Sequence, residues 1–219
     1  MRMAPRDSWL RTWPDLAAFI GGLALAYFLH WSAKDLIWSL WLSSLLVGYT
    51  CIVLTIVSGV WRFHESKGGF AMASVGGAFM LAFFTFHFGM FHFVHSVFVN
   101  VFFPVIPGQR DPNAAMYRAV FASYWPWVIV AALAERRQLR NSWIGADVSN
   151  GGKDLIAGPY KNVMRMHLLI FFFAGATVAH LDSFSIYAVV FFVYFFPWRM
   201  LRHSVDSERT PQPATLDLD

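Results

Sequence analysis

The sequence of 219 residues is poor in charge and contains a single cysteine. Charged residues make up 14% of the chain and hydrophobic residues 57%, whereas soluble domains have about 25% and about 45–50%. This shortage of charge excludes an ordinary soluble surface, because the few charged residues lie between long apolar stretches. The lone Cys51 excludes an internal disulfide and, without other thiolates, a soft-metal or iron–sulfur site. The composition predicts an integral membrane protein.

Several motifs of soluble enzymes are also missing. The chain has no Gly-x-Ser-x-Gly nucleophile elbow, no His-Glu-x-x-His helix and no adjacent pair of histidines. Its Gly151-Gly152-Lys153 segment lacks the spacing of a phosphate-binding loop. These absences exclude the standard hydrolase, zinc protease and nucleotide-binding motifs.

What the sequence does contain is a series of apolar stretches, each compared with the roughly 20 residues that a helix needs to cross a bilayer. Six such stretches are present: Leu16 to Trp31, Leu36 to Val60, Phe70 to Phe103, Met116 to Ala134, Val163 to His180, and Ser185 to Trp198. They predict an all-α fold, a polytopic membrane helical bundle with about six transmembrane helices. We expect one domain over residues 1–203, a cytoplasmic loop from Glu135 to Asn162, and a disordered cytoplasmic tail over residues 204–219.

The basic residues orient this bundle, because cytoplasmic loops carry an excess of lysine and arginine. With the N-terminus inside and six crossings, only Lys34, Arg110 and Arg118 fall on the opposite side. Both termini are therefore predicted to be cytoplasmic. The net charge of +4 is explained by this topology and by contact with anionic lipid, so it does not indicate nucleic acid.

Three histidines, His87, His92 and His95, interrupt a very apolar segment. An ionisable side chain at membrane depth is a functional-site hypothesis, because its desolvation must be offset by a metal, a partner or water. At 100° per residue the three side chains fit within an arc of about 140°, so we expect one shared helix face. The spacing of three between His92 and His95 allows two residues on adjacent turns to bind one ion.

Other helices are expected to bring ligands to the same outer half of the bundle. The first predicted helix ends at His30 with Asp35 just beyond it, and the fifth ends at His180-Leu181-Asp182. We predict metal ligation by His92 and His95, with His180 as the best third ligand and His87 or His30 next. Imidazole and carboxylate suit zinc, iron or copper, and also manganese. Asp182 and Asp35 are the candidate catalytic bases of a metal-dependent enzyme, or acceptors that fix a ligand's tautomer.

Two alternatives stay open. In a metal-free membrane permease or scaffold, these histidines would line a hydrated cavity and relay protons. A single b-type haem could instead be held by two axial histidines, since His167 and His180 have the separation that stacks haems in a bundle. Of these two, only His180 would find a histidine at its own level in the third helix, because Met80 stands where His167 needs one. His64 and His203 lie in basic segments and are expected to be solvated.

The aromatic and small residues add expectations about packing. The tryptophans suit the membrane interfaces, where this residue is enriched; they are Trp31, Trp38, Trp41, Trp61, Trp125, Trp127, Trp143 and Trp198. Gly76 and Gly77 permit close approach of helices. Six short helices leave little room for a transport pathway in one subunit, so we expect a homodimer.

The histidine segment Phe86-His87-Phe88-Gly89-Met90-Phe91-His92-Phe93-Val94-His95, together with Pro159-Tyr160-Lys161 and Arg165-Met166-His167, also carries a resemblance. With a length near 220 residues, this pattern resembles a group of bacterial multi-helix membrane proteins known only as a domain of unknown function. The resemblance implies a location in the bacterial inner membrane. It implies no activity and no ligands.

Overall fold

The computed structural model describes residues 6–144, 168, 171–173, 175–176 and 192. Over these residues the chain is helical and contains no strand. The helices run in the order α1 (Arg6–Phe28), α2 (Ala33–Trp61), α3 (Lys67–Phe102), α4 (Ala114–Ala134) and α5 (Arg136–Ile144). The all-α prediction is confirmed for this part of the chain. The predicted stretches from Val163 to His180 and from Ser185 to Trp198, and the tail, lie almost entirely outside the described residues.

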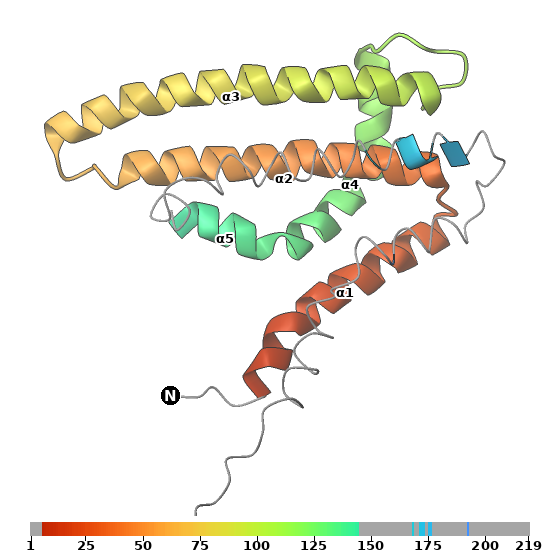
Figure 1. Ribbon diagram of the computed structural model, residues 1–219, viewed down its shortest axis with the longest axis horizontal. Coiled ribbons are helices and arrows are strands. Elements are labelled where there is room, and N and C mark those ends of the chain that lie inside the picture. Colours follow the sequence, from red (N-terminus) through yellow and green to blue (C-terminus); the bar gives the residue numbers. More distant parts are fainter. Residues whose placement is uncertain (1–5, 145–167, 169–170, 174, 177–191, 193–219) are drawn as a thin grey trace, which may run out of the picture.

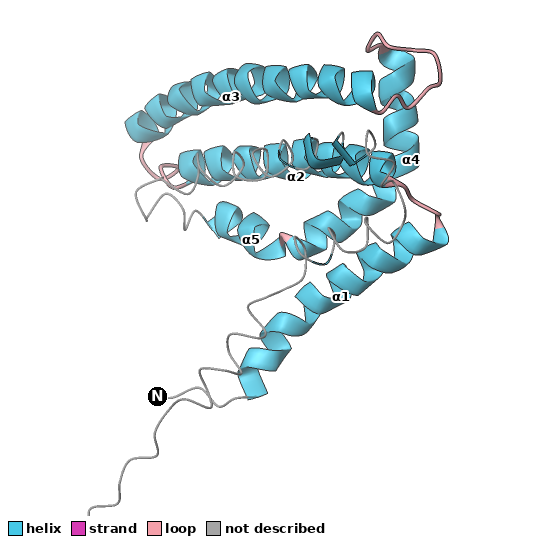
Figure 2. Ribbon diagram, turned by 45° about the vertical axis from the view of Figure 1, so that its right-hand side comes forward, coloured by secondary structure: helices cyan, strands magenta, loops and turns pink. Residues whose placement is uncertain are grey.

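Helices α2 and α3 lie side by side as a long hairpin (Figures 1 and 2). Phe88 of α3 is fully buried and packs with Phe84 against Ile52 of α2. This contact needs a glycine, because a Cβ atom on Gly48 would lie 2.9 Å from the Phe88 ring. Gly77 likewise faces the side chains of α2, which confirms the expectation of close approach there, whereas Gly76 faces open space.

Helix α1 ends on a left-handed residue that turns the chain into α2. His30 has φ of 51°, its N–H donates to the carbonyl of Tyr27, and the N–H of Trp31 donates to the carbonyl of Ala26. These two bonds form a Schellman motif, which satisfies helix-end carbonyls that would otherwise lack a donor. Trp31 is thereby directed into the core, where its ring contacts Trp127 and Tyr124 of α4.

The carboxylate of Asp35 joins the beginning of α2 to α4. It accepts hydrogen bonds from the backbone N–H and the hydroxyl of Ser32, at 2.8 and 2.7 Å. Tyr124 donates to its other oxygen at 2.8 Å. The first interaction caps α2 at its N-terminus, where a negative charge is favourable. The second fixes the position of α4 across α2.

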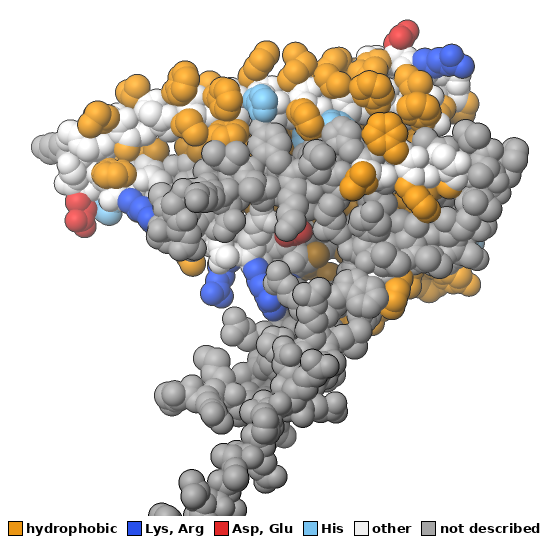
Figure 3. Space-filling model, viewed as in Figure 1, with side chains coloured by type: hydrophobic (Ala, Val, Ile, Leu, Met, Phe, Trp, Pro, Cys, Tyr) orange, Lys and Arg blue, Asp and Glu red, His pale blue; other side chains and the backbone are white. Residues whose placement is uncertain are grey.

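Within the described residues, two helices are long and apolar enough to cross a membrane: α2, over Ala33–Trp61, and α3, over Gly68–Phe102. A shorter apolar helix covers Leu16–Phe28. Hydrophobic side chains project along the outer face of α3 (Figure 3). By their length and composition, these helices agree with a membrane location.

Two expectations about the chain need correction. The predicted loop from Glu135 begins with helix α5, which packs on α2: Ser58 donates to the Ser142 carbonyl and Arg62 to that of Ile144, both at 3.0 Å.

The second correction concerns the tryptophans that the sequence assigns to membrane interfaces. Four of them are buried inside the helical bundle; they are Trp31, Trp38, Trp41 and Trp127. Their indoles fill the junction of α1, α2 and α4.

Candidate functional site

His92 and His95 lie on the enclosed face of α3. Their exposed fractions are 1% and 3%, and their ring centroids are 6.4 Å apart. The spacing of three residues places them on adjacent turns of one helix face, as the sequence predicts. The structure therefore brings these two predicted residues together.

Each imidazole of this histidine pair bonds to the backbone of its own helix. The Nδ1 atom of His92 is 3.0 Å from the Phe88 carbonyl, and that of His95 is 2.7 Å from the Phe91 carbonyl. A carbonyl oxygen only accepts, so Nδ1 must carry the proton in both rings. In a neutral imidazole the other nitrogen, Nε2, is then the acceptor. The same arrangement, with Nδ1 donating to a backbone carbonyl, is typical of histidines that bind metals through Nε2.

Helix α2 closes the site around His92. The hydroxyl of Ser44 lies 3.3 Å from Nε2 of His92, and Trp41 donates from its indole nitrogen to the His92 carbonyl at 2.9 Å. The Phe88 ring contacts the imidazole with centroids 4.2 Å apart. His92 is thus held by polar contacts on both its backbone and its ring.

Further polar side chains follow His92 along the buried face of α3, and the sequence reasoning missed them. Ser96 and Asn100 are fully buried. The hydroxyl of Ser96 lies 2.7 Å from that of Tyr117 in α4. Asn100 donates to the carbonyls of Gln109 and Arg110 in the loop between α3 and α4. The signal was present in the sequence, because Ser96 and Asn100 lie four and eight residues after His92, on successive turns.

Two of the other predicted ligands lie elsewhere. His87 is exposed, and its ring stacks on Phe83 with centroids 5.5 Å apart. The expectation that it shares the buried face of the pair is therefore wrong. His30 is the exposed left-handed residue that ends α1, so its backbone has a structural role. The structure brings neither residue to His92 and His95.

Asp35, a predicted base, also lies away from the pair. At 1.5 Å per residue it is about 13 Å along α2 from Ser44, which contacts His92. Its carboxylate already accepts the three hydrogen bonds from Ser32 and Tyr124. This geometry makes Asp35 a structural link between helices. His180, Asp182 and His167 lie outside the described residues.

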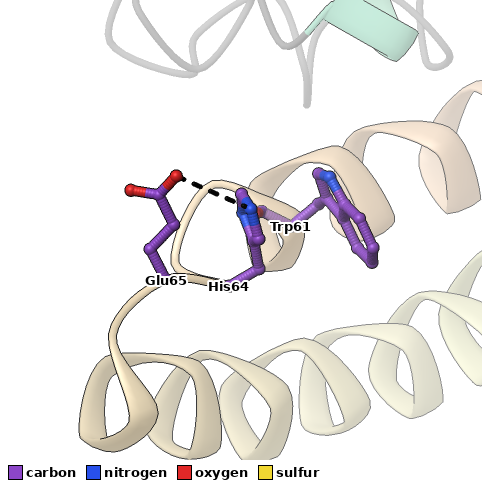
Figure 4. A network of polar contacts seen from close by, with 3 residues as sticks. All are labelled: Trp61, His64 and Glu65. Carbon is purple, nitrogen blue, oxygen red and sulfur yellow. Dashed lines mark hydrogen bonds and ion pairs between the residues drawn. The ribbon is translucent and has the colours of Figure 1, made fainter.

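His64 lies in the turn between α2 and α3, far along the chain from the pair (Figure 4). Its Nδ1 donates to the Trp61 carbonyl at 2.8 Å, and its ring stacks on the Trp61 indole. Glu65 lies 3.9 Å from Nε2, and both side chains are substantially exposed. These contacts are local to a solvated turn, and we assign no ligand role to His64.

The pair by itself is an incomplete metal site. Across the part of the chain that the structure describes, no three histidine, cysteine, aspartate or glutamate side chains gather as a potential site. With metal–nitrogen bonds of about 2.0–2.1 Å, two imidazoles that share a tetrahedral ion have centroids about 5 Å apart. The observed 6.4 Å is therefore slightly wide, and the rings must approach each other by about 1 Å to share an ion.

The described fold and site define an all-helical protein with two helices suited to membrane crossing and a buried histidine pair. The chain belongs to a family of unknown function, DUF6498, whose family model matches residues 1–210. The resemblance to an uncharacterised family is thus confirmed. No curated protein and no solved structure matches the chain.

Proposed function

We propose that this chain is an integral membrane metalloprotein that binds zinc, iron or copper through Nε2 of His92 and His95. The observation that supports this most is the shared orientation of the two rings. Both Nδ1 atoms bond to carbonyls of α3, so both Nε2 atoms carry the lone pair that a metal requires. Burial of both rings in an apolar helix further favours a functional role, because such histidines are costly unless they are compensated.

The third ligand in this proposal is His180. The described residues supply only two ligands, whereas zinc sites in proteins have three or four protein ligands. Three protein ligands with an open fourth position would make the site catalytic, with Asp182 as the base, since Asp35 is committed to α2 and α4. A closed shell of four ligands would make it a structural or metal-handling site.

The proposal includes the finer topology. We place the chain in the bacterial inner membrane with six crossings and both termini in the cytoplasm, so that the pair lies in the outer half of the bilayer. The distribution of lysine and arginine supports this orientation. The length and apolar character of α2 and α3 support the crossings that they would make. The lipid bilayer is then the principal partner, and a homodimer would supply further enclosed volume.

Elemental analysis of protein purified without a histidine tag and without added metal tests this function. We expect about one equivalent of a transition metal per chain, which is lost in the His92→Ala and His95→Ala double variant. His87→Ala is the matched control, because it removes an exposed imidazole from the same helix and should keep the metal. Metal-free protein from metal-replete cells would refute the proposal, as would full retention of metal in the double variant.

The second candidate is a metal-free permease or scaffold in which the pair lines a hydrated cavity. The buried hydroxyl contact of Ser96 with Tyr117 favours this candidate, because it extends the polar surface beyond the histidines. Purified protein that contains no metal would support the permease or scaffold over the metal site. An absorption band near 410 nm, which is the approximate position for ligated haem, would support the single b-type haem.

A further inference from the structure

Asn100 presents a buried acceptor that lacks a donor among the described residues. Its side chain is fully buried, and its Oδ1 atom has no hydrogen-bond partner there. The amide cannot be turned around, because both Nδ2 hydrogens are used by the carbonyls of Gln109 and Arg110, at 3.1 and 2.8 Å. A buried polar atom left in this state is costly and calls for water, an ion or another ligand.

Tyr117 presents a second acceptor on the same side of α3. The Ser96 hydroxyl donates to the Phe93 carbonyl, so its single proton is used and Tyr117 must be the donor in their mutual 2.7 Å contact. The Tyr117 oxygen is then left with lone pairs that can accept. The Tyr117 ring stacks on Trp41, with centroids 6.0 Å apart, and Trp41 in turn binds the His92 carbonyl.

These acceptors are arranged in a line that ends at His92. Residues 92, 96 and 100 follow one another at about 6 Å per step along one face of α3. The line begins beside the loop between α3 and α4, where several residues, Asp111 among them, are exposed. Two positions offer an acceptor with a lone pair to spare, Oδ1 of Asn100 and the hydroxyl of Tyr117 bound to Ser96. At the end of the line, Nε2 of His92 accepts from the Ser44 hydroxyl. A surface of acceptors favours water and cations and disfavours anions.

We infer that Asn100 and Tyr117 line an access route for water and hydrated cations from the loop between α3 and α4 to His92. The route stands on the geometry of Asn100, Ser96 and Tyr117, while the assignment of a metal ion as its cargo rests on the proposed function. Asn100 therefore does more than anchor the loop through its amide group. Its oxygen replaces part of the hydration shell of a cation as the cation leaves the surface.

Cysteine labelling of the full chain in lipid vesicles tests the route. The background is Cys51→Ala, which removes the only thiol, and Asp111→Cys in the exposed loop reports the orientation of the protein. Asn100→Cys and Ser96→Cys should react with a small cationic methanethiosulfonate added on the loop side. Val99→Cys is the matched control, since Val99 is equally buried and lies between them in the sequence.

We expect Asn100→Cys and Ser96→Cys to react about tenfold faster than Val99→Cys, since thiol reactivity requires access to water. An anionic methanethiosulfonate of similar size should react with them more slowly than the cationic one. Equal rates for all three positions would overturn the inference. If Asn100→Cys fails to fold because the loop is released, Ser96→Cys against Val99→Cys decides the question. The labelling experiment uses no metal. If Asn100→Cys and Ser96→Cys are labelled rapidly while elemental analysis finds no metal, the access route is supported and only the metal site is refuted.

Discussion

The two halves of α3 differ in burial although both are apolar. From residue 68 to residue 83 no side chain is buried, whereas the second half contributes the buried Phe84, Phe88, His92, His95 and Asn100, among others. The second half packs between α2, α4 and the loop that follows it. The first half contacts α2 through Gly77 and otherwise presents large apolar side chains, such as Phe79, on its surface. Among the histidines that the structure describes, the two with buried rings, His92 and His95, both lie in the enclosed half.

This difference shows that enclosure by neighbouring elements, and not an apolar sequence, decides which histidines of α3 are buried. His87 is in an equally apolar sequence, yet it is exposed and stacks on Phe83. His92, only about 7.5 Å further along the axis, is surrounded by Trp41, Ser44 and Phe88. A buried imidazole gains from fixed partners and from the exclusion of water, and an exposed one does not.

The largest effect on this comparison should come from Phe88→Ala. The substitution removes a fully buried ring that packs against Ile52 and His92, so we expect a loss of about 3–5 kcal/mol in the free energy of unfolding. Phe79→Ala is the control in the other half, where the side chain is 70% exposed. Unfolding in detergent micelles, followed by circular dichroism, measures both. Similar losses for the two variants would contradict the contrast between the halves.

A smaller effect is expected where the exposed half does touch α2. In Gly77→Ala the new methyl group would lie 2.6 Å from a Val60 methyl, and such overpacking typically costs about 1–3 kcal/mol. Gly76→Ala, one residue earlier, meets nothing within 4 Å and should be neutral or slightly stabilising, because alanine favours helix more than glycine does. The same unfolding measurement applies. A neutral Gly77→Ala would mean that the first half of α3 is not seated on α2 at all.

The smallest effect should follow from Trp41→Phe. This change removes the N–H that donates to the His92 carbonyl, and a single hydrogen bond contributes about 1 kcal/mol. Loss of one ring of the buried indole adds to this. Trp61→Phe, on an indole that is 64% exposed, is the control. If the wild-type chain binds metal as proposed and Trp41→Phe lowers the amount bound, the backbone of His92 contributes to the position of its ring. An unchanged stability would indicate that water replaces the indole.

The helices were predictable from the sequence to a considerable extent. Four of the apolar stretches overlap α1 to α4. Those of the hairpin differ from the observed helices by only a few residues at each end, whereas α1 begins at Arg6, well before the predicted Leu16. Long runs of apolar residues leave few alternatives to a helix, because the backbone must satisfy its own hydrogen bonds in an apolar environment. Helix α5 was missed because its arginines suggested a solvated loop. Its position depends on Ser58 and Arg62, which lie far away in the sequence.

The site was only partly predictable. The spacing of His92 and His95 identifies the pair. The arc of about 140° that also includes His87 is wider than the buried sector of α3, which faces α2 where Ser44 contacts His92. The sequence places His30 at the end of a helix, in the same outer half of the bundle as His92 and His95, which makes it a candidate ligand. The left-handed turn explains its position instead. The burial of Asn100 could not be predicted from its residue type, because it depends on the loop carbonyls of Gln109 and Arg110, to which its amide donates.

The hydrogen bonds from Nδ1 to carbonyls four residues earlier have a consequence for biogenesis. Both acceptors, in Phe88 and Phe91, belong to the same helix as the imidazoles they fix. Helical geometry alone brings donor and acceptor together, so the tautomer is selected as soon as this segment coils. A newly formed α3 would therefore already carry the proton on Nδ1 of both rings, and later docking of its neighbours need only enclose them.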